Sequence, residues 1–328
     1  MSTLLRHVSG PFRLESGAVL ERVEQAYTLT GELNAAKDNL VVVFHSLTGD
    51  ADPLGWWTGV AGSGCVLDPA THAILCTNLL GSCYGTTRPP AGVLVTPRDM
   101  ARLVKRVVDD LGVRSVALAT GGSLGGMVAL EWAATFPSLT RAVVAFAAPA
   151  AHTAQAIGFN HVQRRILDAA GADGLAIARM AAMLTYRTAE EFEARFGRER
   201  RDDDGRFQVQ SYLDHQGEKL VRRFDSVAYR TLLDAMDAHD VGRDRGGVAA
   251  ALRAFGGELV GVGIPGDLLY RAEDVQAWTD AAGCRYEEIH SVHGHDAFLL
   301  EPARVAEILD GRASVARRRS RSSSASSR

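Results

Sequence analysis

The segment Val116-Ala-Leu-Ala-Thr-Gly-Gly-Ser-Leu-Gly-Gly-Met-Val-Ala-Leu-Glu-Trp132 decides the fold of this chain. Its small and apolar residues up to Thr120 predict a buried strand, and those from Leu124 onward predict a helix that ends before Pro137. The residues between them, 121–125, match the pattern Gly-x-Ser-x-Gly. A strand, this pattern and a helix in that order are typical of a nucleophile elbow, a sharp turn that presents a reactive serine.

The chemistry of such a turn makes Ser123 the predicted nucleophile. Glycines on either side leave room for the chain to turn in strained backbone geometry, so the hydroxyl stands clear of the sheet. The start of the following helix directs backbone N–H groups and a positive dipole end toward it, which stabilises the oxyanion formed in acyl transfer. The N–H of Leu124, directly after the serine, is one predicted oxyanion donor.

A second oxyanion donor is expected in the loop 45–50, His-Ser-Leu-Thr-Gly-Asp, which follows the apolar run Asn39–Phe44. Loops at the carboxyl ends of central strands are where open α/β sheets place their ligand chemistry. We assign this role to the N–H of Leu47, with Ser46 as the alternative.

The nucleophile also needs a base and an acid that orients the base. In sheets of this kind they follow the serine in the order acid, then histidine, each in a loop after a late strand. Asp267 follows the apolar run that ends at Ile264, and His295 directly precedes the last predicted helix. These two residues are the predicted acid and base, and His293 is the competing histidine.

Strand-like and helix-like segments alternate along most of the chain, which predicts an α/β fold with a mostly parallel central sheet and helices on both faces. The N-terminal runs Phe12–Leu20 and Val23–Leu29 alternate weakly and predict a hairpin of two strands. The remaining predicted strands are Asn39–Phe44, Ala73–Leu80, Val143–Ala147, Leu259–Ile264 and Arg285–His290, and the clearest further helices are Pro97–Leu111 and Ala272–Ala282.

The alternation divides the chain into four parts. Residues 1–150 and 247–312 carry the core, and residues 151–246, where helical periodicity dominates, predict a helical lid inserted over the sheet. Residues 313–328 contain five arginines, several serines and no acid. Such a composition cannot build a core, so we expect a disordered tail.

The composition and net charge of the chain argue against several classes of binding partner. The chain has 328 residues, is 46% hydrophobic and has a formal net charge of −3, which gives no electrostatic case for nucleic acid. No apolar run reaches the about 18 residues of a membrane helix, and the N-terminus lacks the apolar block of a signal peptide. The four cysteines have neither metal-ligand nor disulfide spacing. We expect a cytoplasmic protein without a membrane partner or a metal.

Several motifs together resemble the homoserine O-acetyltransferases of methionine biosynthesis, over Leu14 to about Ile308. They stand in one order along the chain and are far more specific than the elbow alone. They are His45–Asp50, Gly55-Trp-Trp57, Cys76–Gly85, Gly121–Gly126 with Leu130-Glu-Trp132, Tyr212–Gly217 with Arg223-Phe-Asp225, His239–Arg243, and Gly294–Leu300.

The resemblance implies an α/β-hydrolase fold that carries out ping-pong acyl transfer instead of hydrolysis. Ser123, activated by His295, would take the acetyl group of acetyl-CoA, which is a co-substrate and not a bound cofactor. The homoserine hydroxyl, deprotonated by His295, would then accept the acetyl group, while Asp267 holds the imidazole. The resemblance also implies a homodimer associated through the lid.

The resemblance extends to the substrate-binding residues. It implies that Arg179 and Tyr186 bind the substrate, with Arg179 on the carboxylate of the amino acid, and that Asp296 binds the ammonium group. Family members that use succinyl-CoA tend to carry an arginine two residues after the acid, where this chain has Leu269, so acetyl is the expected group. Three alternatives stay open: serine or another small hydroxyl acceptor, an esterase that uses water, and a relative that only binds ligand.

Overall fold

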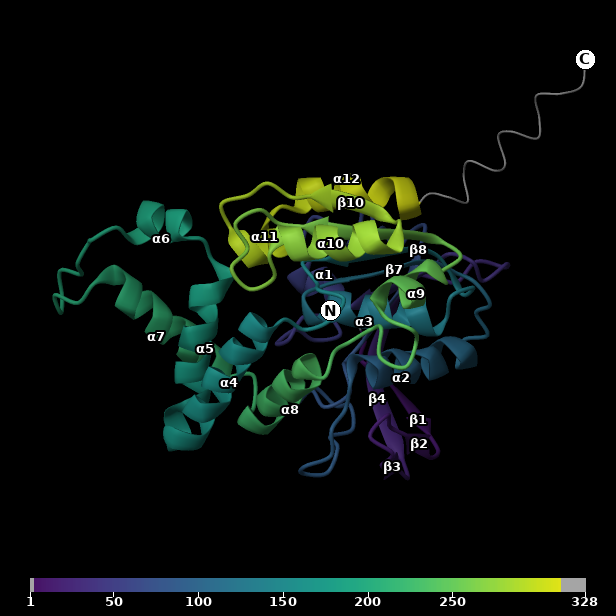
Figure 1. Cartoon of the computed structure of the whole chain (residues 1–328), viewed down its shortest axis with the longest axis horizontal. Coiled ribbons are helices and arrows are strands. Elements are labelled where there is room, and N and C mark those ends of the chain that lie inside the picture. The colour runs from purple at the N-terminus through teal and green to yellow at the C-terminus, as the bar shows by residue number, and fades with distance from the viewer. Residues whose placement is uncertain (1–2, 314–328) are drawn as a thin grey trace, which may run out of the picture.

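The computed structural model describes residues 3–313, and an eight-stranded sheet lies at its centre (Figure 1). The strand order is β1-β4-β6-β5-β7-β8-β9-β10. The predicted tail, 313–328, lies outside the described residues except for Ala313, which is buried at the end of helix α12 (Pro302–Ala313).

Six of the eight strands run parallel to one another, which confirms the predicted mostly parallel α/β sheet. Every residue of the two central strands β5 and β7 is buried, as their apolar sequences predict. The parallel strands are β6 (Ala73–Thr77), β5 (Leu40–Phe44), β7 (Val116–Gly122), β8 (Thr140–Phe146), β9 (Glu258–Gly263) and β10 (Arg285–Glu288).

The predicted N-terminal hairpin is wrong in its pairing. A short hairpin does form, but it joins β2 (Phe12–Arg13) to β3 (Val19–Leu20) through a tight turn at Gly17, where φ is +87°. Strand β4 (Val23–Thr30) instead pairs antiparallel with β1 (Leu5–Ser9) on one side and with β6 on the other. Because the short hairpin closes on itself, the following strand is left to extend the main sheet.

Helices cover both faces of the sheet, as predicted. Side chains of β5 alternate between two hydrophobic clusters, with Val42 in one and Val43 in the other. The first cluster contains residues of α2 (Pro97–Asp110), α3 (Leu124–Thr135), α9 (Val248–Arg253) and α10 (Ala272–Ala282). The second contains residues of α12 and of α11 (Ala297–Leu300), with the segment around the short helix α1 (Pro53–Trp56).

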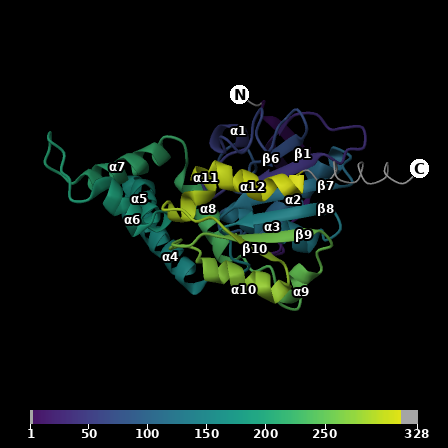
Figure 2. The ribbon, with the colours of Figure 1, turned by 90° about the horizontal axis from the view of Figure 1, so that it is seen from above.

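A group of helices separates β8 from β9 and occupies most of the segment predicted as a lid. Figures 1 and 2 both show α4 to α7 projecting beyond one end of the sheet. Their function as a lid stays a prediction. The helices are α4 (Ala154–Ala169), the 3-10 turn Gly171–Asp173, α5 (Gly174–Tyr186), α6 (Ala189–Phe196), α7 (Gln208–Val221) and α8 (Ser226–Asp237).

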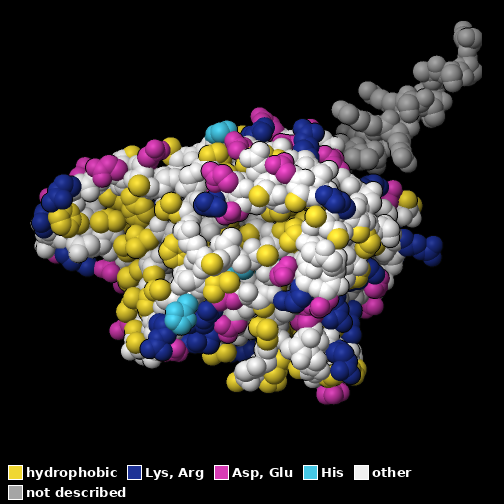
Figure 3. Space-filling view, in the orientation of Figure 1, with side chains coloured by type: hydrophobic (Ala, Val, Ile, Leu, Met, Phe, Trp, Pro, Cys, Tyr) yellow, Lys and Arg dark blue, Asp and Glu magenta, His cyan; other side chains and the backbone are white. Residues whose placement is uncertain are grey.

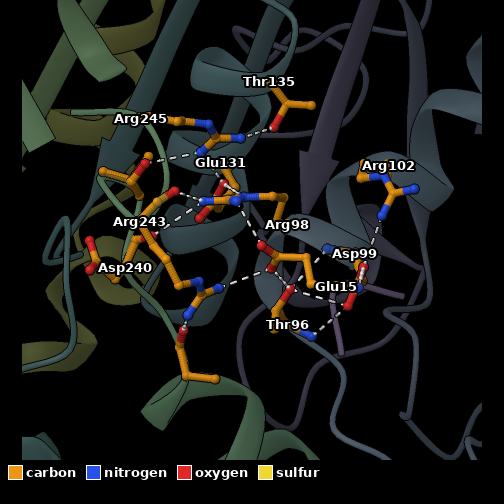
Figure 4. A network of polar contacts seen from close by, with 12 residues as sticks. Glu15, Thr96, Arg98, Asp99, Arg102, Glu131, Thr135, Asp240, Arg243 and Arg245 are labelled. Atoms are coloured by element: carbon orange, nitrogen blue, oxygen red, sulfur yellow. Dashed lines mark hydrogen bonds and ion pairs between the residues drawn. The ribbon is translucent and has the colours of Figure 1, made fainter. Parts of the chain in front are cut away.

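A network of charged side chains fixes α3, the helix that follows Ser123, to its surroundings (Figure 4). Glu131 on α3 is 1% exposed and accepts from Arg98 Nε of α2 at 3.0 Å and from Arg245 Nη1 at 2.7 Å. Glu15 of the N-terminal segment pairs with Arg98 at 2.7 Å and with Arg243 at 3.0 Å. A carboxylate buried this deeply is tolerated because its charge is paired and hydrogen-bonded.

Candidate active site

The turn between β7 and α3 has the strained geometry predicted for a nucleophile elbow. Ser123 adopts φ 58° and ψ −124°, an uncommon conformation for a residue with a side chain. A Cβ on Gly121 or Gly125 would lie 2.5 or 2.2 Å from the carbonyl oxygen of Phe44. The glycines therefore let the first turn of α3 contact the end of β5, which brings the loop after β5 beside the serine.

His295 and Asp267 are joined by a hydrogen bond deep in the structure. His295 lies in the 3-10 turn Gly294–Asp296, and its Nδ1 is 2.7 Å from Oδ2 of Asp267. The other carboxylate oxygen accepts from the backbone amides of Leu269 at 2.8 Å and Tyr270 at 3.0 Å. Asp267 is therefore held on both oxygens and can orient the imidazole.

The pKa of His295 is raised. Burial alone would lower the pKa of the imidazole, but the charge of Asp267 and the hydrogen bond to it outweigh burial. A base with this environment stabilises the imidazolium that forms when it removes a proton from a hydroxyl.

The competing histidine lies elsewhere. The Nδ1 of His293 is 3.2 Å from Oε2 of Glu191, and its side chain is 31% exposed. It does not line the pocket that contains Ser123, whereas His295 does.

The pocket at the elbow has a volume of about 430 Å³. It brings together side chains from the loop after β5, from the elbow, from α5 and from the turn that carries His295. The predicted residues that line it are Leu47, Ser123, Arg179, Tyr186, His295 and Asp296, while Asp267 lies behind His295 and Leu124 begins α3. Within residues 3–313 the Ser123 hydroxyl makes no hydrogen bond to the imidazole, a contact that commonly tightens only when substrate binds.

Arg179 and Tyr186 lie two turns apart on α5 and therefore share one face of the helix. The guanidinium carbon of Arg179 is 5.2 Å from the centroid of the Tyr186 ring, which in turn lies 5.6 Å from the ring of His295. In the part of the chain that the structure describes, no carboxylate lies within ion-pair distance of Arg179. Its guanidinium is available in the pocket for a carboxylate ligand.

Asp296 has a cationic neighbour that sequence reasoning missed. Arg187 Nη2 lies 3.1 Å from Oδ2 of Asp296, and the same guanidinium binds Glu191 at 2.9 and 3.1 Å. Burial raises the pKa of Asp296, and the charges of Arg187, His295 and Arg179 oppose that rise. Arg187 and Asp296 lie far apart in the sequence, so no local pattern indicated this pair.

The loop after β5 forms a turn beside the serine. The amide of Gly49 donates to the carbonyl of Ser46 at 2.9 Å, so Leu47 and Thr48 are the central residues of the turn. Leu124 is the first residue of α3, and an amide at that position has no acceptor inside its own helix. Leu47 and Leu124 thus flank the serine from two segments. The predicted oxyanion role of their amides stays a prediction.

Two cations in the pocket were not assigned from the sequence. Lys219 on α7 and Arg223, just after that helix, both line it. Arg223 directly follows Arg222, but neither Lys219 nor Arg223 lies in a recognised phosphate-binding pattern. Within the described residues, no group of three or more His, Cys, Asp or Glu side chains could hold a metal ion. None of the described helices is both long and apolar enough to cross a membrane.

Comparison with known proteins agrees with the α/β fold described above. A family model described as the alpha/beta hydrolase fold matches residues 39–233. A homoserine O-acetyltransferase of Thermus thermophilus is 42% identical, with 91% of this chain and 88% of that protein covered. One of Nostoc punctiforme is 41% identical, with 91% and 92% covered.

Solved structures show the same similarity. The crystal structure of homoserine O-acetyltransferase from Staphylococcus aureus superposes with a TM-score of 0.84 and 29% identity, covering 95% of both chains. The crystal structure of esterase E22 reaches a TM-score of 0.85 at 15% identity, with 95% of this chain and 100% of that chain covered. At that identity the likeness is one of fold alone.

Proposed function

We propose a mechanism of acetyl transfer for this chain, which belongs to the homoserine O-acetyltransferase family of the α/β-hydrolase fold. The reaction places an acetyl group on the hydroxyl of L-homoserine, a step of methionine biosynthesis. The observation that carries the mechanism is the shared pocket in which Ser123, His295 and Arg179 meet. It combines a nucleophile, a base held by Asp267 and a cation suited to the carboxylate of an amino acid.

The first half of the reaction forms an acyl-enzyme. The hydroxyl oxygen of Ser123 attacks the thioester carbon of acetyl-CoA while His295 takes its proton. The resulting oxyanion accepts hydrogen bonds from the amides of Leu47 and Leu124. When the C–S bond breaks, the proton passes from His295 to the sulfur, and CoA leaves as a thiol.

The second half transfers the acetyl group. The carboxylate of homoserine binds the guanidinium of Arg179, beside Tyr186, and its ammonium group binds Asp296. His295 takes the proton of the homoserine hydroxyl as the oxygen attacks the acetyl carbon. Collapse of this second intermediate breaks the ester to Ser123, which recovers the proton from His295.

The donor is proposed to be acetyl-CoA. Leu269 is buried and aliphatic, and its amide donates to Asp267, so its side chain offers no cation to a succinyl carboxylate. No bound cofactor takes part in these steps.

A homodimer formed through the helical segment is part of the proposal. Figure 3 shows hydrophobic side chains gathered over the projecting helices. Val162 of α4, Leu184 of α5 and Val227 of α8 are 53%, 52% and 53% exposed. A contiguous patch of exposed apolar side chains is typical of an interface between proteins, so we place the dimer contact on these helices. The four free thiols fit the cytoplasm, where disulfides are rare.

The test is release of CoA from acetyl-CoA by the purified protein with homoserine, with serine and with no acceptor, followed by mass spectrometry of the product. We expect homoserine-dependent release, O-acetylhomoserine as product, and loss of both in Ser123→Ala. Equal release without an acceptor would mean that water takes the acetyl group and would refute the transferase. Serine-dependent release would refute homoserine as the acceptor.

A further inference from the structure

Arg223 connects the helical segment to the loop that carries Leu47. Its Nη1 donates to the carbonyl oxygen of Thr48 at 2.5 Å, and its Nη2 lies 3.3 Å from the hydroxyl of the same residue. A third hydrogen bond, 3.2 Å long, runs from Nη1 to the hydroxyl of Tyr84. One guanidinium thus binds both polar groups of the residue that follows Leu47.

These contacts act on the turn through its backbone. The peptide group between Thr48 and Gly49 accepts from Arg223 at its oxygen and donates from its nitrogen to the carbonyl of Ser46. That carbonyl belongs to the peptide group whose N–H is the amide of Leu47. In a trans peptide the N–H and C=O point in opposite directions, so fixing the Ser46 carbonyl fixes the direction of the Leu47 N–H.

The core fixes the same carbonyl from the other side. His45 is fully buried, its Nε2 accepts from the amide of Leu79 at 3.0 Å, and its Nδ1 lies 2.7 Å from the oxygen of Ser46. The imidazole is therefore a neutral ring that donates from Nδ1, and burial lowers its pKa accordingly. The turn is held from the core by His45 and from the helical segment by Arg223.

Arg223 is itself held in place. Its hydrogen-bond partner Tyr84 packs edge-on against the buried ring of Phe224, with centroids 5.7 Å apart. A side chain fixed by packing and by several hydrogen bonds can hold its partner within the narrow limits that an oxyanion donor requires.

We propose that Arg223 is a positioning residue for acyl transfer, because its guanidinium orients the turn 46–49 and so directs the Leu47 N–H at the oxyanion. The inference rests on the proposed function, in which Ser123 forms the acyl-enzyme and Leu47 is an oxyanion donor. A residue of the helical segment would thus help to set the direction of the Leu47 N–H at the oxyanion.

The experiment uses p-nitrophenyl acetate, a small uncharged ester, with the full-length protein. The kcat/KM for p-nitrophenolate release reports acylation of Ser123 whatever acceptor follows. Loss of one oxyanion donor costs about 10²- to 10³-fold, and a misdirected donor costs less. We therefore expect Arg223→Ala to lower kcat/KM about 10- to 100-fold, and Arg222→Ala, which removes an exposed cation paired with Glu218, to leave it unchanged.

Two further readouts separate positioning from a general loss of structure. Guanidinium ions at tens of millimolar should restore part of the activity of Arg223→Ala, whereas sodium chloride at the same ionic strength should not. Arg223→Lys should be intermediate, since an ammonium cannot reproduce the fork that binds Thr48 and Tyr84 together.

Unchanged kcat/KM for p-nitrophenyl acetate in Arg223→Ala would overturn the proposal. If only the KM for acetyl-CoA rose, Arg223 would be a donor-binding cation. Equal effects of guanidinium and sodium would also overturn it, because they would indicate general destabilisation. If the wild type cleaved p-nitrophenyl acetate normally but did not acetylate homoserine, the proposed function would be refuted. The comparison of Arg223→Ala with the wild type on p-nitrophenyl acetate would still decide the role of Arg223.

Discussion

The ring of Tyr270 packs edge-on against the imidazole of His295, with centroids 5.2 Å apart and an interplanar angle of 74°. Tyr270 is fully buried, and its hydroxyl lies 3.0 Å from Nε2 of His152. The Nδ1 of His152 is 3.1 Å from Asp237 at the end of α8, which also pairs with Arg164 of α4 at 2.6 Å. His295, the proposed base, is therefore packed against a side chain that the helical segment holds in position.

Replacing Tyr270 by Phe should keep the packing against His295 and remove the hydrogen bond to His152. The buried Nε2 of His152 would lose its partner, which costs about 1–3 kcal/mol of stability. We expect this loss in the free energy of unfolding by urea, with kcat changed only a few-fold. A large loss of kcat with unchanged stability would show that the hydroxyl acts on the reaction, contrary to this expectation.

The pH dependence of acylation should report His295. Acylation needs the neutral imidazole, and the pKa of His295 is raised above its ordinary value of 6.5, so kcat/KM should fall as the pH drops through that raised pKa. In Asp267→Asn the charge that raises the pKa is gone and burial remains, so the acid limb should move to lower pH. The rate at its plateau should fall about 10³- to 10⁴-fold, because the amide favours the wrong tautomer.

An acid limb that stays in place in Asp267→Asn would contradict the assignment of the limb to His295. The profile is best measured as kcat/KM between pH 5 and pH 9 in buffers of constant ionic strength, since this parameter reports the free enzyme.

Replacing Arg179 by Ala should separate the two halves of the reaction. A charge-assisted hydrogen bond to a carboxylate contributes about 1.5–3 kcal/mol, so the KM for homoserine should rise about 10- to 100-fold. Cleavage of p-nitrophenyl acetate, which has no carboxylate, should change little. Arg198→Ala, which removes a cation outside the pocket, is the matched control. An unchanged KM for homoserine would remove Arg179 from the acceptor site.

Two glycines on helices should respond oppositely to alanine. A Cβ on Gly125 would lie 2.2 Å from the carbonyl oxygen of Phe44, whereas one on Gly158 of α4 meets nothing within 4 Å. Gly125→Ala must move the backbone and should cost about 3 kcal/mol or more. Gly158→Ala should stabilise the protein by about 0.5–1 kcal/mol. Thermal unfolding of both variants checks the pair, and equal shifts would contradict the close contact at the elbow.

The strands and the catalytic residues that could be predicted are marked by local patterns in the sequence. Strands β5 and β7 are continuous apolar runs because both their faces are buried, and the elbow glycines mark a turn that few other residues permit. Ser123, Asp267 and His295 each follow a strand of the parallel sheet, so their positions in the chain predict that they lie at the same edge.

The contacts that could not be predicted join residues that lie far apart in the sequence. Arg223 and Thr48 are 175 residues apart, and nothing near either residue indicates that they meet. Arg187 looks like a helix-end cation until the fold brings Asp296 to it. The pairing of β4 with β1 was missed because an alternating strand carries no information about which neighbour it joins.

The ion-pair network around Glu131 links helix α3, which directly follows Ser123, to the N-terminal segment of the chain. Ser123 and Glu131 stand at opposite ends of two turns of the same helix, so a constraint on the rotation of one sets the direction in which the other points. Glu15 shares Arg98 with Glu131 and also neutralises Arg243. Shortening the chain past Glu15 would therefore remove the carboxylate that Arg98 and Arg243 share, while Glu131 already binds both Arg98 and Arg245. The orientation of Ser123 would then depend on a segment that does not line the pocket.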